Sequence, residues 1–240
     1  MILRIEDLDA PRCKPEYIDA VLEDLQWLGI SWTSGPVFQS RRRSHYLVAW
    51  RKLRDGGFIY PCPHSRRDLE AVTAPHEEEP LFPPELRTST AEALRWEEPT
   101  GSNWRFRVPD GESVRFEDRC QGPVARTAGH DFGDFLIWNR DDVPAYELAV
   151  VVDDSAMGIT EAVRGADLLT STCRQLLLYR ALGELPPAFY HCPLVVDAQG
   201  RRLAKRDASL TLRTLRSQGV NPAQVLAQAQ ASLATKSPAP

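Results

Sequence analysis

The pattern of apolar and polar positions predicts alternating strands and helices along the chain. The apolar run at 148–152 is not interrupted by polar residues, and it is rich in β-branched valine. Such a run is typical of a strand that is covered on both faces, as in the middle of a parallel sheet. Asp153 and Asp154 follow it. Because ligands of open α/β sheets bind beyond the carboxyl ends of strands, these two carboxylates are candidates for chemistry.

A second apolar segment, at 159–163, predicts a strand that leads into Arg164 and Gly165. Gly165 allows a tight turn, and Asp167 can cap a helix or lie in its first turn. We therefore expect Arg164 at a strand end beside the start of a helix. A buried strand with a salt-bridged arginine explains the same pattern, so both interpretations stay open.

Other elements follow from the same periodicities. Helical spacing of apolar residues predicts helices at 15–28, 41–55, 65–72, 90–96, 176–182, 210–218 and 222–233. The second of these helices is expected to be capped by Ser40. Short apolar or alternating runs predict strands at 1–5, 104–108, 113–117, 135–138 and 194–196. The turn signal at 109–111 predicts that 104–108 and 113–117 form an antiparallel hairpin.

The bulk composition is that of an ordinary globular protein and excludes several classes. The chain has 240 residues, 26% charged residues and a net charge of −4, so no global field attracts it to nucleic acid. No apolar stretch of membrane length and no signal peptide is seen. Five scattered cysteines argue against a disulfide framework and for a reducing, cytoplasmic compartment.

A basic cluster at 201–206 is the strongest local charge feature. It holds four cations in six positions, after a predicted strand and turn. Lysine offers a mobile point charge and arginine a bidentate fork, so this loop could pair with phosphates. A solvated surface is the more frequent explanation of a run of charges.

Cys62 and His64 form a Cys-x-His pair, and thiolate and imidazole are preferred ligands of zinc. A structural zinc site needs four ligands, and no further cysteine follows before Cys120. The alternative is that the pair simply precedes the helix predicted at 65–72.

Four segments together resemble one family. They are RIEDLD at 4–9, LAVVVDD at 148–154, VRGAD at 163–167 and RLAKR at 202–206. In order and spacing they are similar to the catalytic domain of glutamyl-tRNA synthetases, which are class I aminoacyl-tRNA synthetases. The chain ends about thirty residues after the basic loop, so its length resembles the short paralogues of that family, the glutamyl-Q tRNA(Asp) synthetases.

The resemblance implies an α/β, Rossmann-like class I catalytic domain. On this view residues 1–60 and 130–206 form the catalytic core, 61–129 an inserted α+β subdomain with an antiparallel hairpin, and 207–240 a short C-terminal helical extension. Members of the family begin with a strand and a HIGH-type helix start that cradles ATP. Here Met1 lies directly on the second family strand. We therefore expect an N-terminally truncated domain, through a start codon assigned too late or because the chain is a fragment.

The resemblance also implies a reaction and a site. Glutamate is activated by ATP without tRNA, and the glutamyl group passes to the queuosine base of tRNA(Asp). Glu6 would hold the α-amino group of glutamate, and Tyr146 and Arg164 its carboxylates. Lys205 would stabilise the departing pyrophosphate. The KMSKS-like loop would bind ATP through Arg202, Leu203, Ala204, Lys205 and Arg206, with Mg²⁺ as the phosphate counter-ion.

Two departures from the family pattern modify this expectation. His64 replaces one cysteine of the zinc set, and Phe82 and Leu86 stand where tyrosine and cysteine ligands would be. Neither side chain can bind zinc, so the sequence predicts that the metal has been lost. In the basic loop, Arg202 and Ala204 replace the usual lysine and serine.

Two other functions stay open on the sequence alone. The chain could be a catalytically inactive paralogue that binds tRNA or a protein partner, or a fragment of a glutamyl-tRNA synthetase. In each case we expect a cytoplasmic monomer that does not contact membranes.

Overall fold

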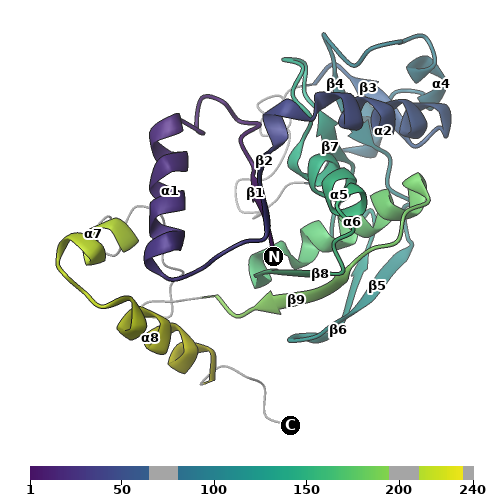
Figure 1. Ribbon diagram of the computed structural model, residues 1–240. Helices are drawn as coiled ribbons and strands as arrows, with labels where there is room; N and C mark the ends of the chain where they lie inside the picture. The colour runs from purple at the N-terminus through teal and green to yellow at the C-terminus, as the bar shows by residue number, and fades with distance from the viewer. Residues whose placement is uncertain (65–80, 195–210, 235–240) are drawn as a thin grey trace. The chain divides into compact units, whose positions relative to one another are not determined.

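The computed structural model describes residues 1–64, 81–194 and 211–234 (Figure 1). These residues form two compact units, one of 1–40 with 192–240 and one of 41–191. The predicted helix at 65–72, most of the predicted strand at 194–196 and the basic loop at 201–206 lie outside the described residues. The domain boundaries expected from the family resemblance stay a prediction.

The first unit contains a parallel strand pair with a helix between the strands in the sequence. Its elements are β1 (Ile2–Ile5), α1 (Pro15–Trp27), β2 (Ser34–Phe38), α7 (Leu212–Ser217) and α8 (Pro222–Ala234). Arg216 on α7 pairs with Glu23 on α1 at 2.7 Å. A strand–helix–parallel strand order is the βαβ unit of α/β folds. The strand predicted at 1–5 and the helices predicted at 15–28, 210–218 and 222–233 are confirmed.

One sheet of the second unit is a three-stranded antiparallel sheet. Its order is β3 (Ile59–Cys62), β4 (Asn103–Phe106) and β7 (Phe135–Trp138). Helix α2 (Arg43–Asp55) packs on it and brings Trp50 against Trp104, with the ring centroids 4.7 Å apart and perpendicular. The short α4 (Thr90–Ala93) lies beside β3. Edge-to-face contacts of this kind are favourable for aromatic rings.

The other sheet of the second unit has four strands in the order β6 (Gly122–Thr127), β5 (Ser113–Asp118), β9 (Ala188–Cys192) and β8 (Glu161–Gly165). Helix α6 (Leu169–Leu182) packs against β5 and β6 and ends at Gly183, whose φ of 64° is left-handed. The helix predicted at 176–182 ends at the same residue as α6, and glycine is a usual helix stop. The strand predicted at 159–163 is confirmed as β8.

The apolar run at 148–152 is a helix, so the prediction of a buried strand there was wrong. It belongs to α5 (Tyr146–Ala156), in which residues 148–151 are buried on successive positions. The helix packs against α2, α6 and β7, and a helix covered on all sides is apolar all round. A short apolar run does not distinguish a buried strand from a buried helix.

Two further predictions are corrected by the contacts of single elements. The runs at 104–108 and 113–117 do not pair with each other, because β4 pairs with β3 and β7 while β5 pairs with β6. Ser40 does not cap α2, whose N-cap residue is Arg42. Instead Ser40 donates its backbone N–H and its hydroxyl to the Asp7 carboxylate, at 2.8 and 2.6 Å.

Candidate functional site

Tyr146 and Arg164 lie in the second unit, on segments that are joined by the first turn of α6. Tyr146 begins α5 and is 37% exposed. The next residue, Glu147, is buried and accepts a hydrogen bond from the Ser171 hydroxyl. The neighbour of that serine, Thr172, accepts one from Nη2 of Arg164 at 2.7 Å. Ser171 and Thr172 are consecutive on α6, so one turn of this helix bonds both segments that carry the predicted glutamate-binding residues.

The Arg164 guanidinium is fixed by three neighbours. Its Nε donates to Nε2 of His191 at 3.2 Å, and its Nη2 donates to Thr172. Its Cζ lies 5.0 Å from the ring centroid of Phe189, within cation–π range. These bonds use two of the five guanidinium N–H groups, so three remain among the described residues for an anion. A planar fork of this kind is suited to a carboxylate.

A wholly buried pair, His191 and Asp118, lies behind this arginine. Nδ1 of His191 is 2.6 Å from Oδ2 of Asp118, and both side chains are fully buried. The backbone N–H groups of Cys120, Gln121 and His191 all donate to Oδ1 of Asp118. Burial acts to raise the pKa of Asp118, but the bonds from His191 and these N–H groups outweigh it and hold the pKa below its usual range.

The pKa of Glu147 is shifted in the opposite direction to that of Asp118. Its burial raises its pKa, and this effect outweighs the hydrogen bonds from Ser171 and Gln175 and the attraction of Arg174 and Arg164. A carboxyl group that is harder to ionise therefore lies directly beside Tyr146. The sequence reasoning did not single out this residue.

The remaining predicted site residues belong to other parts of the chain. Glu6 belongs to the first unit, where it follows β1 and pairs with Nη2 of Arg4 at 3.1 Å. The KMSKS-like loop, with its proposed ATP-binding residues, lies outside the described residues. Within the described residues, the structure brings together the surroundings of Tyr146 and Arg164.

Asp153 and Asp154 were predicted to follow a strand as candidates for chemistry, and the strand placement was wrong, because both lie in α5. The contacts of Asp153 are with other side chains of the core. Asp153 is fully buried and accepts hydrogen bonds from Nε of Arg42 at 2.6 Å and from the Tyr46 hydroxyl at 2.9 Å. Both partners precede or belong to α2, so Asp153 joins α2 to α5. Its role is to hold two helices together.

The surroundings of Cys62 do not fit a zinc ion. Cys62 is buried in an apolar cluster with Tyr60, Phe82 and Leu86, and the last two have no donor atom. Within the described ranges, no three His, Cys, Asp or Glu side chains are grouped so as to hold a metal. The loss of zinc stays a prediction, and no chemical step below depends on zinc.

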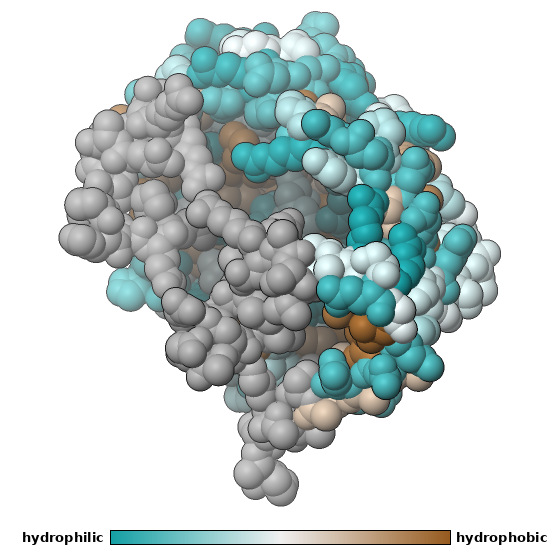
Figure 2. Space-filling view, turned by 90° about the vertical axis from the view of Figure 1, so that its left-hand side faces the viewer, coloured by the Kyte–Doolittle hydropathy of each residue, from teal (hydrophilic) through white to brown (hydrophobic). Residues whose placement is uncertain are grey.

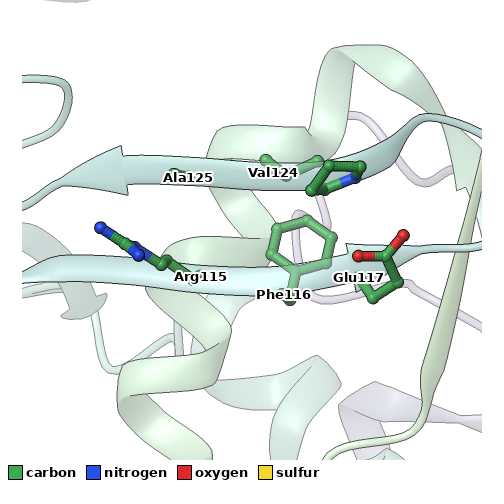
Figure 3. Close-up of a pocket in the computed structure, with 6 residues that line it drawn as sticks. Arg115, Phe116, Glu117, Val124 and Ala125 are labelled. Carbon is green, nitrogen blue, oxygen red and sulfur yellow. The ribbon is translucent and has the colours of Figure 1, made fainter.

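A groove on the β5–β6 hairpin is separate from the predicted site residues. It is lined by Arg115, Phe116, Glu117, Pro123, Val124 and Ala125. Figure 3 shows the charged side chains of Arg115 and Glu117 on either side of Phe116. The groove includes none of the predicted glutamate-binding residues, so it is not the candidate site.

Asp118 and His191 were missed by the sequence reasoning, although the pattern of burial contains a signal for each. On β5 the inward positions are Val114, Phe116 and Asp118, and on β9 they are Phe189 and His191. A charged side chain at an inward position of an alternating strand needs a buried partner. The two residues are 73 positions apart, so the sequence alone does not pair them.

The described surface that faces the viewer in Figure 2 is mainly hydrophilic, with hydrophobic residues in small patches. Among the described helices, none combines the length and the apolar character that crossing a membrane requires.

Comparison with known proteins relates this arrangement to one enzyme family. Residues 1–232 match the family described as "tRNA synthetases class I (E and Q), catalytic domain". Two similar proteins are both named glutamyl-Q tRNA(Asp) synthetase. One, from Nitratidesulfovibrio vulgaris, is 43% identical over 238 residues, and one from Symbiobacterium thermophilum is 43% identical over 239 residues. Each match covers 94% of this chain and 73% of the relative.

More distant relatives are longer proteins. A glutamate–tRNA ligase of Synechococcus sp. (strain JA-3-3Ab) is 38% identical over 92% of this chain but only 47% of its own length. A solved glutamate tRNA ligase from Elizabethkingia meningosepticum, in complex with its amino acid, superposes with a TM-score of 0.73 and 28% identity. That match covers 87% of this chain and 45% of the ligase chain, so the chain spans less than half of that structure. The predicted α/β, Rossmann-like class I fold is confirmed by this similarity.

Proposed function

Because this chain belongs to the family of class I tRNA synthetases for glutamate and glutamine, we propose that it activates glutamate with ATP and transfers the glutamyl group to the queuosine base of tRNA(Asp). The observation that carries the proposal is the similarity over most of the length of relatives named for that activity. The guanidinium of Arg164 supports it, because only two of its N–H groups are bonded among the described residues and glutamate presents two carboxylates to its binding site.

The first chemical step joins glutamate to ATP. An oxygen of the α-carboxylate attacks the α-phosphorus of ATP, pyrophosphate leaves, and glutamyl-adenylate forms. In the second step the glutamyl group passes to queuosine and AMP is released. ATP carries Mg²⁺ as the counter-ion of its phosphates.

The residues of the chain bind and orient the reactants. In this proposal Glu6 accepts hydrogen bonds from the α-ammonium of glutamate, while Tyr146 and Arg164 donate to its carboxylates. Lys205 and its neighbours at 202–206 contact ATP. The ammonium of Lys205 compensates the charge that develops on the departing pyrophosphate, and one such preorganised group contributes about 3 kcal/mol to transition-state stabilisation.

The proposed compartment follows from the state of the cysteines. All five cysteines are free. Free thiols are typical of reducing compartments. We therefore assign the chain to the cytoplasm. We also expect it to act as a monomer, which sedimentation of the purified protein will check.

The test of the transfer step uses three tRNA substrates with radiolabelled glutamate and ATP. They are tRNA(Asp) that carries queuosine, an unmodified transcript of tRNA(Asp), and tRNA(Glu). We expect acid-precipitable label only on the queuosine-containing tRNA. Label on the terminal adenosine of tRNA(Glu) would instead assign the activity of a glutamyl-tRNA synthetase. Binding of tRNA without any label would support an inactive paralogue.

A further inference from the structure

The buried pair of His191 and Asp118 has no role in the proposed reaction so far, although its position is unusual. Two fully buried polar side chains are held 2.6 Å apart inside an apolar sheet face, next to Phe116 and Phe189. Burial of such groups is costly unless each is hydrogen-bonded. Asp118 bonds one side of the His191 ring, and His191 bonds Arg164 on its other side.

The hydrogen bonds fix the form of the histidine ring. Asp118 is a carboxylate that only accepts, so Nδ1 of His191 carries the proton and donates it. Nε of Arg164 always carries a proton, so Nε2 of His191 must offer a lone pair to accept its bond. The ring is therefore the neutral Nδ1–H tautomer, and protonation of Nε2 would set two donors against each other.

Thr172 completes the arrangement on the same side of the guanidinium. Its hydroxyl accepts from Nη2 of Arg164 at 2.7 Å and can donate its single proton to the Leu168 carbonyl at 3.0 Å or to Nε2 of His191 at 2.9 Å. Phe189 covers the guanidinium through its ring face. One edge of Arg164 is thus bound, and within the described ranges the opposite edge, which contains Nη1, keeps its donors.

We propose that His191, held in one tautomer by Asp118, is a positioning residue that aims the free edge of Arg164 at a carboxylate of the amino-acid substrate. The inference rests on the proposed role of Arg164 in glutamate binding. A histidine that is fixed by a carboxylate on one nitrogen presents a defined lone pair on the other, and a guanidinium bound through one edge loses little entropy when a ligand binds.

A matched pair of variants separates this role from a purely structural one. The amide of His191→Gln reaches the place of Nε2, so its oxygen can accept from Arg164 while the bond to Asp118 is lost. The amide of His191→Asn reaches the place of Nδ1, so it can donate to Asp118 while the bond to Arg164 is lost. Each variant removes one of the two buried bonds, so stability alone does not distinguish them.

The glutamate affinity of the 240-residue chain, measured by isothermal titration calorimetry, distinguishes the two variants. We expect the dissociation constant for glutamate to rise about tenfold in His191→Asn, as for a lost hydrogen bond to a charged group, and to stay within about threefold of wild type in His191→Gln. The dissociation constant for ATP should stay unchanged in both. Equal losses of glutamate affinity in the two variants, or a larger loss in His191→Gln, would overturn the positioning role.

A measurement on the wild-type chain covers the case in which a variant does not fold. In ¹⁵N-labelled protein, NMR can detect the coupling across the bond from Nε of Arg164 to Nε2 of His191, with the signal assigned by its loss in Arg164→Lys. We expect this coupling and a protonated Nδ1. A protonated Nε2 would overturn the inference. Wild-type protein that shows the coupling but does not bind glutamate would refute the proposed function and leave the orientation of Arg164 established.

Discussion

Two buried carboxylates of the second unit, Asp153 and Asp118, show how similar groups lead to different roles. Asp153 is bonded by Arg42 and Tyr46, and this network joins α2 to α5. Asp118 is bonded by His191, which in turn bonds Arg164. The first network joins two helices of the core. The second ends on a cation that, among the described residues, keeps three N–H groups for an anionic ligand.

Removal of the Asp153 carboxylate should produce the largest loss of stability. Asp153→Ala leaves the largely buried Arg42 without its partner, and we expect the free energy of unfolding to fall by about 3 kcal/mol, as is usual for a broken buried pair. Urea denaturation followed by circular dichroism measures this loss. The exposed Asp141→Ala is the control. A stability equal to that of the control would show that the Asp153 network does not hold the helices together.

Arg164→Ala should act on binding more than on folding. Its guanidinium is part-buried and its free donors are proposed to bind glutamate, so we expect a loss of about 2 kcal/mol in glutamate affinity, roughly thirtyfold. Calorimetric titration with glutamate provides the measurement, with Arg119→Ala as an exposed arginine control. If glutamate bound equally well to both variants, Arg164 would belong with Asp153 among the structural residues.

Glu147→Gln should change how stability depends on pH. Because burial raises the pKa of Glu147, the folded state binds its proton more tightly than the unfolded state. The unfolding free energy therefore falls as pH rises from the ordinary glutamate pKa of about 4.3 through the raised value in the folded state. Asp118, whose pKa is lowered, contributes the opposite slope in both proteins.

The difference between wild type and Glu147→Gln isolates this one carboxyl group. Urea denaturation between pH 4 and pH 8 should show the variant gaining stability relative to wild type as pH rises. The exposed Glu161→Gln is the control variant. A constant difference for Glu147→Gln would mean that the buried carboxyl group ionises as easily in the folded as in the unfolded chain.

The smallest effect is expected at the exposed pair of Arg119 and Glu161. Their atoms are 2.6 Å apart, but the side chains are 57% and 42% exposed. Exposed ion pairs contribute little, so Arg119→Ala should change the unfolding free energy by no more than about 0.5 kcal/mol. Thermal denaturation measures this change. A loss as large as that of Asp153→Ala would contradict the distinction between buried and exposed pairs.

Most elements could be predicted from the sequence because their signals are local. Helix α1 shows its apolar spacing between Pro15 and Gly29, and α6 ends at Gly183 as expected. The strand prediction for 148–152 was wrong because a helix buried on all sides has the same apolar composition as a buried strand. The predicted pairing of β4 with β5 was wrong because a turn signal does not reveal that the two strands belong to different sheets.

The candidate site was only partly accessible to sequence reasoning. Arg164 could be placed at a strand end because Gly165 and Asp167 mark the turn into the next helix. Its supporting residues could not be found in this way, since His191 and Asp118 come from strands far apart in the chain. Contacts of this kind depend on the order of strands in the sheet, which no local pattern specifies.

The most direct test of the central claim is the exchange of radiolabelled pyrophosphate into ATP, in the absence of tRNA, by the wild-type chain and by Arg164→Ala. The account predicts exchange that depends on glutamate in the wild type and is reduced at least tenfold in the variant. Absence of glutamate-dependent exchange in the folded wild-type protein, or equal exchange by both proteins, would contradict it.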